Sequence, residues 1–352
     1  MAEPTSALST QELVLTVAEY YGVASYDSDG LPYIPADDVF NLRECTRLVN
    51  EAIRMFIARP PRKTGKWRWM HRTQTVTFDA DGTGDENISS DAARYMLSTD
   101  FNGQVAGPIQ YIAESGHGIP IKWCDISEIV ANREIDITGG YPMRAAIRPY
   151  TPTGPSLGAR RWEIIFDPSP SSAKSVQFPY IAGFDKLVLS GGTATGASTT
   201  TVVDSTRTEP DDYFVGWTAT IISGTGKGSY ATVTDYTKST GTITVADWLD
   251  IEGSAGGTDP VTGSIYVLEP AANLHPCGIQ FDEAVRTACL AKCEMEADDS
   301  ELGTRYIEYF EKIALPNAHA IDTNSAPRTL GKMCGGSRVA YERTREDVTF
   351  TE

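Results

Sequence analysis

The spacing of hydrophobic residues changes along the chain, and this change constrains the fold most strongly. Apolar side chains recur at helical spacing over residues 37–59 and 279–315, and a shorter helix is expected at 9–22. From residue 67 to about 184 they alternate, as in strands. Because the helices at both ends must bury their apolar faces, we expect them to form one bundle. The pattern predicts an α+β fold with a long β-rich middle.

The expected helices have recognisable ends. Ser9 and Glu12 form a capping box at the start of the first helix. Asp37-Asp38 can cap the second, and Pro60-Pro61 ends it. After the β-rich middle, helices are expected at 279–296 and 301–315, with Pro316 as the stop of the last one.

Residues 186–269 differ in composition from the rest of the β-rich middle. They are rich in Thr, Gly and Ser, with turn signals about every ten residues, which is typical of a small β-sandwich or barrel. Ten acidic residues stand against four basic ones. We therefore expect an inserted acidic β domain, with strands at 202–203, 218–222, 230–234, 242–245 and 264–268.

These patterns divide the chain into four parts. The expected parts are a core of N-terminal helices and β structure at 1–185, the inserted acidic β domain at 186–269, the C-terminal helices of the core at 270–333, and an extended tail at 334–352. The tail alternates charged with aliphatic and aromatic residues, so it has too little apolar surface to fold alone. We expect it to need a partner.

Composition restricts the class of protein. The 352 residues carry a formal net charge of −17, which argues against nucleic-acid binding over the whole surface. The six cysteines show no CxxC spacing, the first residues lack a signal-peptide pattern, and no apolar run approaches the ~20 residues of a membrane span. We expect a protein made in the cytoplasm, with reduced cysteines and no membrane contact.

Two groups of residues resemble known catalytic or metal-binding motifs, but neither has the required pattern. The glycines of 224–229 surround a lysine, yet a phosphate loop needs Ser or Thr directly after that lysine and a helix behind it. We expect a β-turn. A zinc site usually has tight ligand pairs with short spacers, and His275, Cys277, Cys289 and Cys293 offer only one loop pair and one helical pair. We expect these thiols to be buried and structural. With four histidines and no nucleophile elbow, the sequence predicts no enzyme, cofactor or metal.

Trp67, Arg68 and Trp69 form the most unusual short motif. They end a stretch, residues 36–72, with nine Lys or Arg against four Asp or Glu. In the simpler interpretation, which we favour, the tryptophans anchor the helix end in the core while the cations stay in solvent. Otherwise they contact a neighbouring subunit or DNA in a channel, the subunit being preferred because Trp and Arg are enriched at interfaces. The three remain candidate partner-binding residues.

Several short segments follow one another along the chain: 48–53 before the two tryptophans, 95–101, 162–170 leading into 178–180, and 283–291 with Glu294 nearby. In this order they resemble the head-to-tail adaptor proteins of tailed bacteriophages, including the tail-tubular type of short-tailed phages. Residues 213–228 with Trp248 are similar to a β module of phage virion proteins. The acidic insertion is larger than a minimal adaptor needs.

The resemblance implies a structural protein of the virion neck, present as a homo-oligomeric ring that is commonly twelvefold. Such a ring binds the portal protein and other neck or tail proteins, and DNA passes through its channel only transiently. The C-terminal tail is expected to reach the portal or a neighbouring subunit by strand addition. Its candidate contact residues are Arg338, Val339, Tyr341, Val348 and Phe350.

Two other functions remain open. The Thr- and Gly-rich β domain and its tryptophans also suit a tail-associated carbohydrate-binding or depolymerising protein, which would need a groove with two opposed carboxylates. A tube-forming tail subunit should be nearly all β, and the strong helices count against it.

Overall fold

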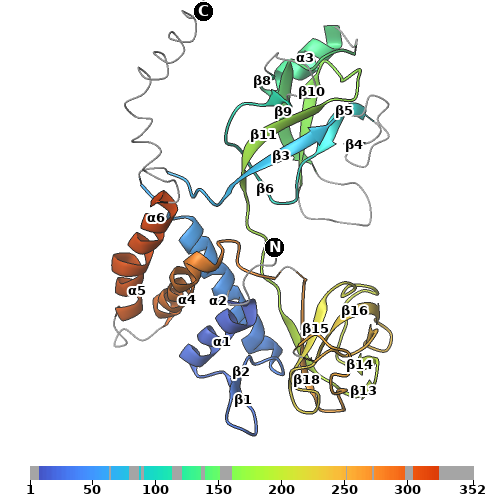
Figure 1. Cartoon of the computed structure of the whole chain (residues 1–352), viewed down its shortest axis with the longest axis vertical. Coiled ribbons are helices and arrows are strands. Elements are labelled where there is room, and N and C mark those ends of the chain that lie inside the picture. The colour runs from blue at the N-terminus through green and yellow to red at the C-terminus, as the bar shows by residue number, and fades with distance from the viewer. Residues whose placement is uncertain are drawn as a thin grey trace, which may run out of the picture. The chain divides into compact units, whose positions relative to one another are not determined.

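The structure, a computed structural model, is a mixed α+β fold (Figure 1). The chain divides into two units, one made of residues 1–65 and 186–352 and the other of residues 66–185. The described residues are 8–62, 65–78, 87–88, 91–112, 121–135, 139–150, 161–250, 252–271, 273–297 and 304–324.

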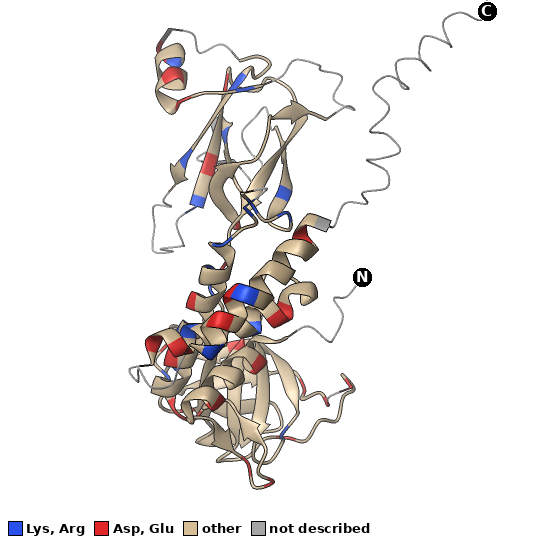
Figure 2. Ribbon diagram, turned by 90° about the vertical axis from the view of Figure 1, so that its left-hand side faces the viewer, with Lys and Arg blue, Asp and Glu red and all other residues tan. Residues whose placement is uncertain are grey.

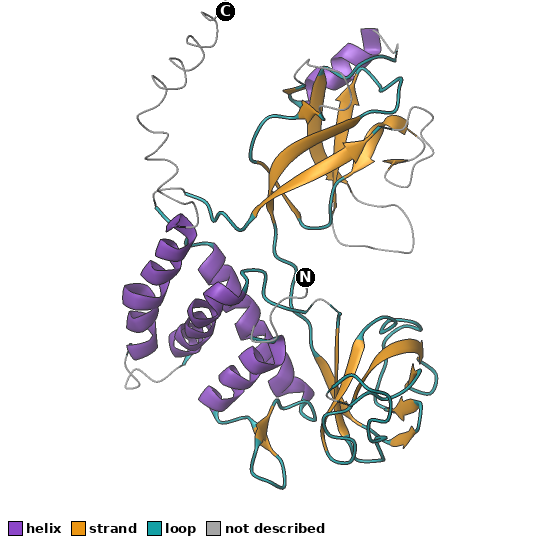
Figure 3. Cartoon of the chain, in the orientation of Figure 1, coloured by secondary structure: helices purple, strands orange, loops and turns teal. Residues whose placement is uncertain are grey.

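The helices of the first unit come from both ends of the chain and contact one another (Figures 1 and 3). They are α1 (Thr10–Tyr21), α2 (Val39–Ile57), α4 (Asp282–Glu296), α5 (Arg305–Tyr309) and α6 (Leu315–Asn324). A 3-10 turn (Ile279–Phe281) precedes α4, and a two-stranded hairpin, β1 (Ser25–Tyr26) and β2 (Pro32–Tyr33), lies between α1 and α2. The rings of Phe56 and Phe281 lie 6.0 Å apart, so residues from opposite ends of the chain share one core.

The predicted N-terminal caps are confirmed. The Ser9 hydroxyl accepts from the backbone N–H of Glu12, whose carboxylate accepts from the Ser9 N–H at 2.7 Å. The Asp38 carboxylate accepts from the N–H groups of Phe40 and Asn41 at 3.0 and 3.1 Å. Both caps satisfy N–H groups that have no partner within the helix.

The prediction that Pro316 ends the last helix is wrong. After α5 the chain forms a π-helical turn (Phe310–Ala314) and continues as α6 beyond Pro316. The π turn interrupts the α-helical hydrogen-bond ladder, so Pro316 stands in the first turn of a new α-helical segment. A proline is tolerated there because the π turn has already disturbed the regular bonding of the preceding turn.

Residues 66–185 fold into two sheets that are antiparallel except at the β8–β9 pair. The orders are β4-β5-β10-β9-β8 and β3-β11-β6, with β7 also paired to β11. The strands are β3 (His71–Thr77), β4 (Asn87–Ile88), β5 (Asp91–Met96), β6 (Phe101–Val105), β7 (Gln110–Tyr111), β8 (Lys122–Trp123), β9 (Arg144–Tyr150), β10 (Arg161–Asp167) and β11 (Ser175–Ala182). Strands expected at 74–78, 144–148 and 162–166 are confirmed within three residues at each end. Sequence reasoning missed one helix, α3 (Ile126–Ile135).

Residues 186–269, here called the β module, hold seven strands in the order β12-β18-β15-β16-β17-β14-β13. The five expected strands are present, within one residue at their starts and three at their ends, and the Gly-containing β12 and β13 were missed. The bounds are β12 (Ser190–Thr193), β13 (Gly196–Ser198), β14 (Thr201–Val203), β15 (Thr218–Ser223), β16 (Tyr230–Thr237), β17 (Thr242–Val245) and β18 (Ile265–Glu269). Within the described residues this sheet does not close into a barrel.

Residues 224–229 connect β15 and β16, and the predicted turn is confirmed. The N–H of Lys227 donates to the Gly224 carbonyl at 3.2 Å, and that of Ser229 to the Gly226 carbonyl at 2.9 Å. Gly224, Gly226 and Gly228 have φ values of 84°, 86° and 87°, a region that favours glycine. The glycines therefore allow the backbone conformation of the turn.

None of the described helices combines the length and apolarity that a membrane crossing requires.

Candidate binding pocket

A buried asparagine ties the start of the β module to α2. The Asn50 side chain donates to the Leu187 carbonyl at 2.9 Å and accepts from the Leu187 N–H at 2.8 Å. It also donates to the Thr46 carbonyl at 2.8 Å within α2. Asn50 is 2% exposed, so these hydrogen bonds replace water that the backbone of Leu187 cannot reach.

A second asparagine joins the two ends of the β module. Asn273 accepts from the Val188 N–H at 3.1 Å and donates to the Val188 carbonyl at 3.0 Å. The backbone carbonyl of Asn273 accepts a hydrogen bond from the Thr10 hydroxyl in α1. Burial raises the pKa of the neighbouring Glu269 carboxyl, although Asn273 and Gln11 donate hydrogen bonds to it. The segment from 187 to β12 is thereby fixed beside the N-terminal half of α2.

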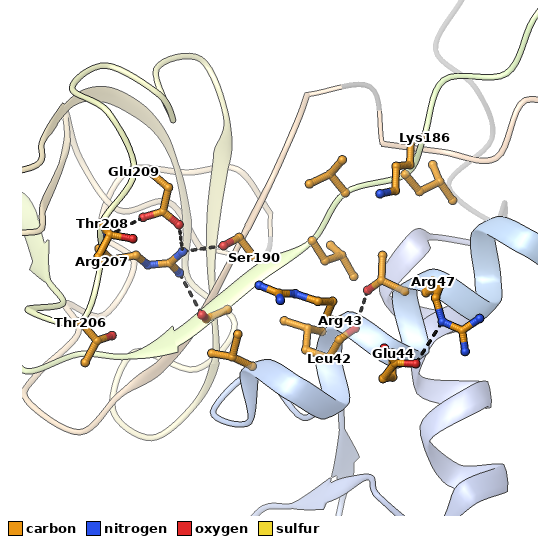
Figure 4. A pocket seen from close by; sticks show the side chains of 16 residues that line it. Leu42, Arg43, Glu44, Arg47, Lys186, Ser190, Thr206, Arg207, Thr208 and Glu209 are labelled. Carbon is orange, nitrogen blue, oxygen red and sulfur yellow. Dashed lines mark hydrogen bonds and ion pairs between the residues drawn. The ribbon is translucent and has the colours of Figure 1, made fainter.

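A pocket of about 550 Å³, here called the α2–β12 pocket, opens between these elements (Figure 4). Gly191 brings β12 so close to the chain before α2 that a Cβ on it would lie 2.6 Å from the Cβ of Ala36. The lining residues are Val39, Leu42, Arg43, Glu44, Thr46, Arg47, Lys186, Leu187, Val188, Leu189, Ser190, Gly191, Thr206, Arg207, Thr208 and Glu209.

Arg207 forms one wall of the pocket, and its side chain is 6% exposed. It donates to the Tyr266 hydroxyl at 2.8 Å and to the Gly191 carbonyl at 2.9 Å. Its bond to Glu209, at 3.2 Å, is drawn in Figure 4. Burial alone would lower the pKa of Arg207, but Tyr266, Glu209 and Asp204 outweigh it and raise the pKa. The Arg207 guanidinium is therefore charged, and each of its three nitrogens donates to a group of the β module.

Two further cations at the pocket are exposed. Arg43 projects from α2, and Lys186 lies at the entry to the β module (Figure 4). In the part of the chain that the structure describes, no carboxylate lies within ion-pair distance of either. Arg47 differs, because it pairs with Glu44, Glu51 and Glu296 at 2.7–3.0 Å. The pocket thus offers two uncompensated positive charges beside apolar side chains, a combination that suits an anionic, partly apolar ligand.

The Trp67–Trp69 motif lies at the start of the second unit. Trp67 is 1% exposed, Trp69 is half-buried and Arg68 is exposed. The two indole rings lie 6.4 Å apart. Burial of Trp67 leaves its ring without surface for stacking on a base in this conformation.

Several cations of the basic stretch 36–72 are paired with acidic residues. Arg47 bonds Glu296 of α4, and Arg59 bonds Glu311 at 3.0 Å. Lys292 of α4 bonds Glu51 of α2 in return, also at 3.0 Å. Figure 2 shows both signs of charge intermixed on these helices. Part of the local positive charge therefore holds the helices together.

Three of the cysteines that do not form a zinc motif in the sequence lie in the core. Cys277, Cys289 and Cys293 are buried, and burial raises the pKa of Cys293 to about 12. His275 contacts Asp282 at 2.8 Å. Among the described residues, no three His, Cys, Asp or Glu side chains come together as metal ligands.

Of the eight candidate partner-binding residues, the structure describes only those of the Trp67–Trp69 motif. Arg338, Val339, Tyr341, Val348 and Phe350 lie outside the described residues. The α2–β12 pocket was not anticipated from the sequence, because its cations stand on α2, at the module entry and in a loop. The isolated Arg207 in an acidic segment was the one available signal.

Comparison with known proteins gives no family. No protein-family model matches the sequence, and no curated protein matches it significantly.

Proposed function

We propose that this chain is a structural virion protein, a head-to-tail adaptor that assembles as a ring, commonly twelvefold, and joins the portal to the tail. Its core would be the bundle of N- and C-terminal helices, and DNA would pass through its channel transiently. Its partners would be the portal protein, further copies of itself and other neck or tail proteins.

The observation that supports this proposal most is the contact between helices from opposite ends of the chain. α1 and α2 contact α4, although more than 200 residues separate them in sequence. The β-rich residues lie between these helices along the chain. The order of sequence segments that resembles phage adaptors begins and ends in these same helices.

A ring also needs a surface for its neighbour, and the first turn of α2 supplies an apolar one. Phe40 is 73% exposed and Val39 is 58% exposed. An aromatic side chain this exposed at a helix start gains nothing from its own fold. In a head-to-tail ring, such a protrusion fits a different surface of the next subunit.

The experiment is to mix the purified chain with its portal and image the product by negative stain. We expect rings with a central hole, seated on the portal. Phe40→Asp should leave a folded monomer, because Phe40 is exposed, and should prevent ring formation. Phe40→Leu, which keeps the apolar surface, is the matched control and should still assemble. A chain that stays monomeric and does not bind the portal would contradict the adaptor function.

One observation favours a second function, the tail-associated carbohydrate-binding or depolymerising protein. Tyr213 of the β module is 49% exposed, and its ring lies 5.6 Å from that of Trp217. Aromatic rings of this kind can stack on sugars. Binding or cleavage of host polysaccharide that is lost in Tyr213→Ala, with no ring formed, would establish this function instead.

A further inference from the structure

We infer that the α2–β12 pocket binds a segment of this same protein, residues Glu346–Glu352. The inference goes beyond the adaptor proposal and does not depend on it, because it concerns only this chain. It rests on matching charge and apolarity between the pocket and the segment.

The pocket contributes two positive charges and an apolar wall. Arg43 and Lys186 are exposed, and no carboxylate pairs with them among the described residues. Val39, 58% exposed, stands on the same lining. In a chain with a net charge of −17, an uncompensated pair of cations beside apolar carbon is unusual. An occupant with carboxylates and apolar side chains would satisfy both features.

The segment 346–352 has this chemistry. Its sequence, Glu-Asp-Val-Thr-Phe-Thr-Glu, contains three acidic residues and no Lys or Arg. Val348 and Phe350 stand two positions apart, so an extended backbone would direct them to one side. The acidic residues at both ends of the segment supply the negative charge that Arg43 and Lys186 lack in the pocket.

A long stretch of chain precedes the segment. Twenty-one residues separate Asn324, the last described residue, from Glu346. An extended chain of that length spans at most about 75 Å.

Another groove offers a weaker match. It lies between α4 and α5, is about 300 Å³ in volume and contains Arg286 and Arg305. The Arg305 guanidinium is already stacked on the Tyr306 ring at 4.8 Å. This groove is therefore smaller than the α2–β12 pocket, and one of its two cations already contacts an aromatic ring. It is the alternative binding site that the experiment must distinguish.

The test places a photo-crosslinking phenylalanine analogue at position 350 of the full-length chain. Cross-linked peptides are then identified by mass spectrometry. We expect cross-links to peptides that contain residues 39–47 or 186–191. The yield should fall about tenfold in the double variant Arg43→Glu with Lys186→Glu, and also in 1 M salt, which shortens the screening length to about 3 Å.

Two controls make the result decisive. Arg54→Glu reverses an exposed cation on α2 that does not line the pocket, and it should leave the cross-links unchanged. Glu346→Lys with Asp347→Lys should restore the yield in the double variant, which also shows that this variant is folded. Cross-links to the α4–α5 groove instead, or a yield indifferent to Arg43 and Lys186, would overturn the inference.

Discussion

The two β regions of the chain each bury a charged cluster, and the charge at the centre has the opposite sign. In residues 66–185 the centre is Glu163 on β10, whose side chain is 1% exposed. Arg94 of β5 bonds it at 2.8 Å, and Arg148 of β9 bonds its other oxygen. In the β module the centre is Arg207, surrounded by Asp204, Glu209 and Tyr266.

The difference between the clusters lies in what holds them. Glu163 pairs directly with Arg148 in the sheet register, so strand pairing alone brings these two charges together. Arg207 stands on the connection between β14 and β15 and reaches β12, where it forms a pocket wall. A buried charge is therefore no sign of function by itself. A charge that a loop carries to the edge of a cavity is a better sign.

The largest effect is expected when Glu163 loses both partners. Arg94→Met with Arg148→Met should destabilise residues 66–185 by about 3–5 kcal/mol, because a carboxylate would stay buried without a cation. Hydrogen exchange of peptides from β10 would measure this local free energy. As a control, adding Glu163→Leu to the same variant should restore most of the stability. If the triple variant is as unstable as the double one, packing rather than charge holds this sheet.

Removing the central charge of the β module should cost less. Arg207→Met is expected to destabilise the module by about 2–3 kcal/mol. Asp204 would keep the Tyr266 hydroxyl at 2.7 Å and the Thr206 N–H at 3.0 Å as donors. Glu209, with a side chain 29% exposed, can turn toward solvent. Hydrogen exchange of β12 and β18 measures the cost, and a larger loss than in the Glu163 cluster would reverse the comparison.

The sequence predicted the elements whose residues alone determine their structure. The caps at Ser9 and Asp38 need only a few neighbouring residues, and the turn at 224–229 needs only its glycines. The strand β12 was missed because Ser190–Thr193 contains two glycines, and its pairing with β18 comes from tertiary context. The helix α3 was missed because its apolar residues do not form a clear stripe.

The pocket could not be predicted for a related reason. Arg43, Lys186 and Arg207 are far apart in sequence, and the hydrogen bonds of Asn50 bring their elements together. Nothing in the residues around Asn50 distinguishes it from a polar residue on a helix surface. Its role depends on a backbone segment 137 residues away.

The third-largest loss of stability is expected from the uncharged contact between Asn50 and Leu187. Asn50→Ala removes both hydrogen bonds to Leu187 and leaves buried backbone groups without partners, so we expect a loss of about 2 kcal/mol. Limited proteolysis near residue 186 and thermal melting measure it. Asn102→Ala, at an exposed position, is the matched control and should change stability by less than about 0.5 kcal/mol. Equal effects in both variants would mean that Asn50 does not fix the pocket.

The smallest effect concerns an ion pair that is partly exposed. Lys292 first, and then Arg47, lower the pKa of Glu296 to about 2. A carboxyl whose pKa is lowered by folding stabilises the folded state at pH values above its unfolded pKa of about 4.5. This stabilisation is lost as the pH falls toward the folded pKa of about 2. The Glu296 side chain is 30% exposed, so solvent screening limits the contribution to about 0.5 kcal/mol. Other carboxyls titrate in the same range, so the measured quantity is the difference in melting between the wild type and Glu296→Gln. That difference should be present at pH 7, shrink below pH 4.5 and decrease in 1 M salt. A constant difference at every pH would show that Glu296 acts through packing, and the contrast between exposed and buried charges would then not extend to the helices.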